Sequence, residues 1–386
     1  MASEARAWRW LLLLMPVALL HRAAYGMARV GAAYAPLEHG RDWELDRVAL
    51  SLASHAHWVG YLLTAALCWR LPPKLVLCLG AAIFLAGAGV LAASPELAQV
   101  GLVVIELGHA VTALSFWLVL ARMFGAGERH LCSVAFVGLV LAYTLGTVVG
   151  STALELAHRY VTRSGWVVLV AAAAAAVAVF AWAACSSPRE RVSLVGARPV
   201  LLRAGVATVV WSGVALVGLV SVSYVELAEA STTGVMIAAV SSSLATLAAP
   251  IGLYLLHRRQ AAISTLQLVA LAVLLLGLGA AASRWGGGAV GVVGVALWGG
   301  AAVVVKPLLA AWLTFGAPTR WAAIGLAAKL CVGALLAYLL AAAPPGVTLY
   351  GAASGVGLAL ALTLLATARS LDAKLGPPDV DAPRSF

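Results

Sequence analysis

The chain has 386 residues, of which 63% are hydrophobic and only 10% charged, with a mean hydropathy of +1.00 and a formal net charge of +10. Soluble globular proteins contain about 45–50% apolar and about 25% charged residues, so this composition excludes a water-soluble domain. Lipid surrounds most of the side chains, and the positive charge is expected to mark cytoplasmic ends of membrane spans rather than a nucleic-acid site.

Apolar runs long enough to cross a bilayer follow one another along the chain. A hydrocarbon core of about 30 Å requires about 20 apolar residues per helix. Such runs cover residues 8–35, 48–69, 73–93, 97–121, 131–153, 164–185, 204–226, 233–256, 261–282, 288–312, 320–343 and 346–368. The sequence therefore predicts an all-α, polytopic transmembrane helical bundle of about 12 spans. The first run contains Pro16; a cleaved signal peptide is an alternative there, and a kinked span is the simpler interpretation.

A polar, basic segment divides the predicted spans into six plus six. Residues 186–203 form the longest polar interruption between Arg41 and the tail, and they hold several arginines. We therefore expect an N-terminal six-helix half at 1–185, a basic cytoplasmic central loop at 186–203, a C-terminal six-helix half at 204–368 and a cytoplasmic tail at 369–386.

Basic residues gather on one side of the predicted bundle. If the N-terminus is cytoplasmic, 16 Lys and Arg lie on the inward side and 5 lie in outward loops, which agrees with the positive-inside rule. Both termini are therefore predicted to be cytoplasmic. The inward residues are Arg6, Arg9, Arg70, Lys74, Arg122, Arg129, Arg189, Arg191, Arg198, Arg203, Arg258, Arg259, Arg320, Arg369, Lys374 and Arg384.

Ionisable residues inside spans are candidates for function, because burying them costs several kcal/mol. Glu106 and His109 are three residues apart and share one face of the span at 97–121, while His55 and His57 lie in the span at 48–69. His57 and Glu106 both lie roughly 13 Å below the outer surface. We predict an intramembrane polar site of His57, Glu106 and His109. It is either a proton-accepting site or a set of hydrogen bonds that hold helices together.

A second candidate is a basic pair in the cytoplasmic half. Lys306 and Lys329 lie on successive spans at similar depths, roughly 13 Å from the inner ends. Two ammonium groups at one level are suited to line a pathway for an anion. The alternative is that each side chain extends along its own stem to the inner headgroups, with Pro307 ending the regular helix just after Lys306.

The sequence does not indicate a metal site or an enzyme active site. The pairs Glu106/His109 and Glu155/His158 have the E-x-x-H spacing of di-iron bundles, but their predicted depths in the membrane differ. No nucleotide loop, dinucleotide fingerprint, Cys-x-x-Cys or hydrolase motif occurs in the sequence. We therefore expect no metal, no cofactor and no enzymatic activity.

The cysteine and asparagine contents are informative. The five cysteines occur in or beside apolar runs without metal-ligand spacing, which favours small buried hydrophobic side chains over disulfides or metal ligands. They are Cys68, Cys78, Cys132, Cys185 and Cys331. The chain contains no Asn, which excludes N-glycosylation, and the excess of Arg over Lys indicates a GC-rich genome, bacterial or viral.

Several local motifs resemble those of a known transporter scaffold. The stretch Trp69–Lys74, followed by Gly80, is similar to the loop motif of the major facilitator superfamily, and Gly146 and Gly150 resemble its glycine-rich packing motif. The resemblance implies a secondary transporter. Two features depart from it: the loop lacks the expected acidic residue, and the span at 97–121 has Glu106 where an arginine is common.

A worn transporter-like scaffold of this length, without Asn, resembles the multi-spanning envelope protein family of alphaherpesviruses. That resemblance implies a non-catalytic protein of the virion envelope and host membranes that restrains glycoprotein-driven fusion or aids envelope assembly. Its partners would be the lipid bilayer and viral envelope glycoproteins or other membrane proteins, with no nucleic acid. The alternative function is a secondary transporter of the major facilitator type in a bacterial inner membrane, moving an unknown small solute with protons.

Overall fold

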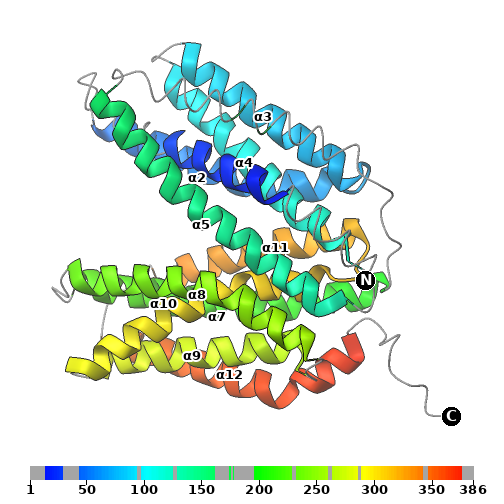
Figure 1. The fold of residues 1–386 in the computed structure, drawn as a ribbon, viewed down its shortest axis with the longest axis vertical. Helices are drawn as coiled ribbons and strands as arrows, with labels where there is room; N and C mark the ends of the chain where they lie inside the picture. The colour runs from blue at the N-terminus through cyan, green and yellow to red at the C-terminus, as the bar shows by residue number, and fades with distance from the viewer. Residues whose placement is uncertain are drawn as a thin grey trace. The chain divides into compact units, whose positions relative to one another are not determined.

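The computed structural model describes residues 14–28, 43–93, 97–124, 128–160, 174, 177, 195–227, 232–259, 263–285, 288–341 and 347–375. In these residues all regular secondary structure is helical (Figure 1). After a helix at 14–28 come α2 (Trp43–Leu67), α3 (Pro73–Ala93), α4 (Ala98–Ala121), α5 (Arg129–Tyr160), α7 (Ala197–Leu227), α8 (Thr232–Arg258), α9 (Thr265–Trp285), α10 (Gly288–Thr314), α11 (Thr319–Ala341) and α12 (Val347–Leu375).

Each of these helices coincides with a predicted span, so the prediction of an all-α polytopic bundle is confirmed. The predicted span at 164–185 lies outside the described residues, apart from positions 174 and 177. Seven of the described helices are long and apolar enough to cross a membrane. In hydrocarbon every backbone N–H and C=O has to be satisfied within the segment, which is why apolar runs of this length become helices. The chain is a multi-pass integral membrane protein.

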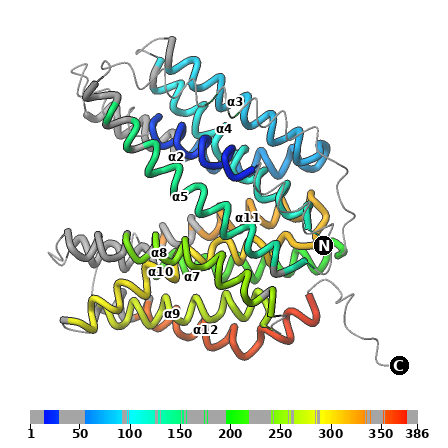
Figure 2. The backbone as a smooth tube through the Cα atoms, viewed as in Figure 1, coloured from blue at the N-terminus to red at the C-terminus, as the bar shows by residue number. Residues whose placement is uncertain are grey.

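The chain divides into two compact units. Unit 1 comprises residues 1–123 and 141–190, and unit 2 comprises residues 124–140 and 191–386. Helix α5 is continuous across the division, so its first turns belong to unit 2 and the remainder to unit 1. Figure 2 follows the backbone of unit 1 from the helix at 14–28, in dark blue, to α3 and α4, in blue to cyan.

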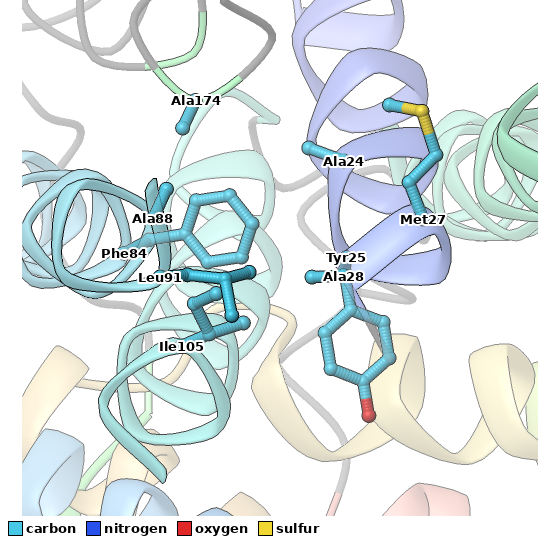
Figure 3. Close-up of a cluster of buried hydrophobic side chains, with 9 residues drawn as sticks. All are labelled: Ala24, Tyr25, Met27, Ala28, Phe84, Ala88, Leu91, Ile105 and Ala174. Carbon is cyan, nitrogen blue, oxygen red and sulfur yellow. The ribbon is translucent and has the colours of Figure 1, made fainter. Parts of the chain in front are cut away.

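Unit 1 packs tightly because glycines let helices approach one another. A Cβ at Gly60 of α2 would lie 2.6 Å from the Cβ of Ala110 in α4, and one at Gly87 of α3 would lie 2.7 Å from the backbone nitrogen of Ile105. No side chain fits at such distances. The buried core around these contacts joins the helix at 14–28 to α3 and α4 (Figure 3). Its members are Ala24, Tyr25, Met27, Ala28, Phe84, Ala88, Leu91, Ile105 and Ala174.

In unit 2 the helix bounds differ most from the predicted spans at two ends. Helix α7 begins at Ala197 and therefore includes the last residues of the predicted central loop, and α12 continues to Leu375. Arg203, expected as a charge on the cytoplasmic surface, is fully buried. Its guanidinium donates to carbonyl oxygens where α10 and α12 end, including Phe315 at 2.9 Å. Helix ends leave carbonyls without partners, and a buried arginine satisfies them here.

The cysteines behave in two ways. Cys68 and Cys132 are buried and Cys331 is partly buried, and these three cysteines form no disulfide, as expected for small hydrophobic side chains. Cys78 is disulfide-bonded, so the interpretation of all five cysteines as unpaired hydrophobic residues is wrong. Sequence spacing could not indicate this bond, because a disulfide depends on which residues meet in space.

Candidate functional site

The centre of the candidate site is the carboxylate of Glu106, on α4 in unit 1. Its side chain is only 1% exposed. The hydroxyl of Tyr25, from the helix at 14–28, donates to it and lies 2.9 Å from Oε1 and 3.0 Å from Oε2. Nδ1 of His57, from α2, lies 2.9 Å from Oε2. Three helices therefore each place one polar group at the same buried point.

His57 links the buried carboxylate to a second hydroxyl. Its side chain is 23% exposed, so it is the more accessible member of the pair with Glu106. Its other ring nitrogen, Nε2, lies 2.7 Å from the hydroxyl of Tyr61. The two residues are four apart on α2 and therefore share one helix face. With the proton on Nδ1, the imidazole donates to Glu106 and accepts from Tyr61; protonated on both nitrogens, it forms an ion pair with Glu106.

His109 lies one turn further along α4 and forms the second row of the cluster. Its ring stacks on the ring of Tyr25, with centroids 3.7 Å apart. Its Nδ1 is 3.3 Å from Nε2 of His21, and its Nε2 is 3.4 Å from Nη1 of Arg22. The Nε of Arg22 donates to the hydroxyl of Thr147 on α5, at 3.1 Å. The three predicted residues thus lie in one polar cluster built from four helices.

The members that sequence reasoning missed come mainly from the helix at 14–28. His21, Arg22 and Tyr25 lie within about one turn of that helix and contact α4. The signal was present, since three polar residues interrupt an apolar run, but the same pattern also fits the end of a signal peptide. Nδ1 of the buried His21 and the buried hydroxyl of Tyr143 have no hydrogen-bond partner among the described residues.

The lysine pair is found in unit 2. Lys329 on α11 is 1% exposed, and its ammonium donates to the backbone carbonyl of Lys306 on α10 at 3.2 Å. Both ammonium groups lie over the ring of Trp211 on α7. The alternative in which both lysines extend to the headgroups does not hold for Lys329, because its buried side chain reaches no surface.

The di-iron alternative is not supported by the side chains that the structure describes. Within that part of the chain, no three His, Cys, Asp or Glu side chains are arranged to hold a metal ion. The second E-x-x-H pair, Glu155 and His158, is on α5, but its side chains lie outside what the structure describes.

The groups around Glu106 can accept and donate protons, and they lie within hydrogen-bonding distance of one another. A proton added to Glu106 or His57 would change the charge of the cluster inside a low-dielectric interior, where each charge interacts strongly with its neighbours. The short contacts at both nitrogens of His57 provide a continuous route from Glu106 to Tyr61.

No protein-family model and no curated protein matches the sequence. Solved structures do match. The structure of a variant of the E. coli fucose:proton symporter FucP aligns with a TM-score of 0.72 at 12% identity, over 95% of this chain and 99% of that one. This chain has a major-facilitator-like fold. FucP in its outward conformation aligns with a TM-score of 0.65 at 12% identity, over 93% and 99% of the two chains.

A third solved structure is the proton:xylose symporter XylE bound to 6-bromo-6-deoxy-D-glucose. It aligns with a TM-score of 0.63 at 13% identity and covers 96% of each chain. At such identities the likeness concerns the fold alone. This likeness in fold confirms the major-facilitator-like scaffold that the motifs indicated. The resemblance to alphaherpesvirus envelope proteins gains no support from these matches and stays a prediction.

Proposed function

We propose that this major-facilitator-like chain is a secondary transporter that moves a small solute and takes up a proton at Glu106. The observation that carries the proposal is the burial of the Glu106 carboxylate, at 1% exposure, in hydrogen-bonding contact with Tyr25 and His57. The names of the similar structures, a fucose:proton symporter and a proton:xylose symporter, agree with proton coupling in this fold.

Magnitudes favour a proton site over a structural hydrogen bond. An ionisable group in a membrane span costs roughly 2.5–3.5 kcal/mol on insertion scales. Each of the two interhelical hydrogen bonds of Glu106, to Tyr25 and to His57, returns only about 0.6–2 kcal/mol inside a membrane, so together they do little more than offset that cost. A Gln at position 106 would hold α2 and α4 together at lower cost. A carboxylate at this position therefore points to a role that needs its charge to change.

A mechanism follows from the geometry of the pair. When His57 is protonated and Glu106 is ionised, an ion pair joins α2 to α4 across 2.9 Å. Protonation of Glu106 removes its charge and weakens that link. The strength of the contact between α2 and α4 then depends on whether Glu106 is protonated. A solute that binds more tightly to one arrangement of these helices therefore has its binding coupled to proton binding.

The proposal is tested by following the carboxyl group directly, which requires no knowledge of the solute. Purified full-length protein is titrated between about pH 5 and about pH 9, a range that covers shifted carboxyl and histidine titrations, and infrared difference spectra are recorded. We expect a carboxylic acid C=O band that appears on acidification, disappears in Glu106→Gln and persists in Glu128→Gln. Glu128 is a matched control because it is partly exposed and lies outside the cluster.

A measurement of proton flux tests the transport part of the proposal. Protein in liposomes that contain a pH-sensitive dye receives fucose or xylose, the sugars in the names of the similar symporters. We expect proton flux into the liposomes with the wild type and none with Glu106→Gln. If the infrared spectra contain no titrating band that depends on Glu106, the proton site is refuted regardless of the sugar result.

The envelope-protein function is the second candidate. It is favoured by the segment after α2, where Trp69, Arg70 and Leu71 are exposed and no acidic residue occurs before α3 begins. The resemblance implies that such a protein restrains glycoprotein-driven fusion. Cell–cell fusion driven by viral glycoproteins, measured with and without this chain, decides the matter: an unchanged fusion rate counts against this function.

A further inference from the structure

A lysine side chain is buried in unit 2 without a carboxylate partner among the described residues. The side chain of Lys329 on α11 is 1% exposed, and its ammonium uses one of three N–H donors on the carbonyl of Lys306, at 3.2 Å. No carboxylate in the described part of the chain lies within ion-pair distance of this ammonium. A buried ammonium with incomplete hydrogen bonding and no counter-charge is costly, which makes it a candidate for binding something.

An aromatic ring brings the second lysine to the same place. The ammonium nitrogens of Lys329 and Lys306 lie 5.2 Å and 5.9 Å from the ring centroid of Trp211 on α7. The indole packs against α11, because a Cβ at Gly333 would lie 2.5 Å from its Cδ1 atom. Three helices thus hold two ammonium groups around one rigid indole, whose ring face attracts cations.

A purely structural role does not account for this arrangement. Two positive charges near one ring repel each other, and apolar side chains would stabilise the packing of α7, α10 and α11 better. Pro307 directly follows Lys306 and removes a backbone hydrogen bond of α10 at this level. A proline within a membrane helix leaves one backbone carbonyl without its usual intrahelical partner, which adds a polar group near the two lysines.

We propose that Lys306, Lys329 and Trp211 form a binding site for a small oxyanion, a solute that bears a carboxylate or phosphate group. The anion supplies the missing negative charge and accepts the remaining N–H donors of Lys329. This site goes beyond the proposed proton coupling, since it lies on other helices and requires no transport. Complete burial of Lys329 favours a soluble anion over a lipid headgroup.

The test is direct binding to the full chain in a neutral detergent. Equilibrium dialysis measures the binding of radiolabelled phosphate and, separately, of radiolabelled acetate to the wild type and to variants. We expect saturable binding of at least one probe. Lys329→Met and Lys306→Met should each weaken it by about tenfold or more, as loss of one charge-assisted contact predicts. Methionine is chosen because an apolar side chain of similar length removes a buried charge and keeps the packing, which thermal unfolding of each variant verifies.

Two controls separate this site from general charge effects and from the proton site. Arg320→Met removes one positive charge from the same helix at an exposed position, and binding should change by less than about twofold. Glu106→Gln should also bind normally, so the two proposals can fail independently. The proposal is overturned if neither probe saturates up to about 10 mM, a very weak affinity, or if Lys329→Met binds like the wild type. Displacement of phosphate by phosphatidylglycerol added to the micelles overturns the assignment to a soluble anion.

Discussion

Replacing Arg203 tests whether a single buried side chain holds the ends of two helices in unit 2. Its Nε and Nη2 both donate to the carbonyl oxygen of Leu375, the last residue of α12. Its Nη1 donates to the carbonyls of Phe315, at 2.9 Å, and Trp312, at 3.3 Å, where α10 ends. Gly316 follows with a φ of 68°, a left-handed conformation that terminates a helix.

The magnitude follows from these contacts. A hydrogen bond to a charged group contributes about 1.5–3 kcal/mol, and Arg203→Met removes contacts to three carbonyl oxygens. Removal of a buried charge returns several kcal/mol of desolvation cost, which offsets part of the loss. We expect Arg203→Met to lower the free energy of unfolding by about 2–4 kcal/mol. Arg203→Lys should lose less stability than Arg203→Met, because its ammonium keeps the positive charge. It should still be less stable than the wild type, because an ammonium cannot reach all three carbonyl oxygens as the planar guanidinium does.

The assay is reversible unfolding of the full chain in mixed micelles of dodecyl maltoside and SDS, followed by circular dichroism. The matched control is Arg198→Met, which removes the same charge five residues earlier on α7, at an exposed position. If Arg203→Met and Arg198→Met differ by less than about 0.5 kcal/mol, the usual scatter for surface substitutions, the assignment of Arg203 as a helix-end clamp is refuted.

Two further predictions concern the approach of α2 to α4 and the orientation of the chain. Gly60→Val should push α2 away from Ala110 and the carbonyl of Leu107, so that the infrared band of Glu106 shifts or broadens; Gly89→Val, which meets nothing within 4 Å, should leave that band unchanged. A fluorescent protein fused after Phe386 should fluoresce in intact cells, because the positive-inside rule places the C-terminus in the cytoplasm; a dark fusion that is inserted in the membrane would contradict that orientation.

The sequence by itself determined the class of fold and the position of each described helix. Hydrocarbon leaves no other partner for the backbone, so an apolar run of about 20 residues becomes a helix wherever it occurs. The bounds of α3 (Pro73–Ala93), with the polar turn before it, agree with the predicted span. The candidate residues His57 and Glu106 could also be found, because a charge inside an apolar run is visible in the sequence and its depth follows from the helical rise.

The groups that contact each buried charged side chain, in contrast, are decided by the tertiary structure. The sequence places Lys329 inside a span and Arg203 in the cytoplasmic central loop, but it indicates no partner for either of them. One lies against Trp211 without a carboxylate among the described residues, whereas the other satisfies the carbonyls at two helix ends. Nothing local to either residue distinguishes these outcomes, because the decisive groups come from other helices.

The same reason explains why Tyr25 and His21 were missed in the Glu106 cluster. Their ring contacts with His109 depend on how the helix at 14–28 packs against α4. Apolar periodicity does not specify that packing, since lipid and protein neighbours are equally apolar and only small residues such as Gly60 select which helices meet. Hydropathy determines that the chain forms helices in a membrane; the close contacts between helices decide which buried charges have partners.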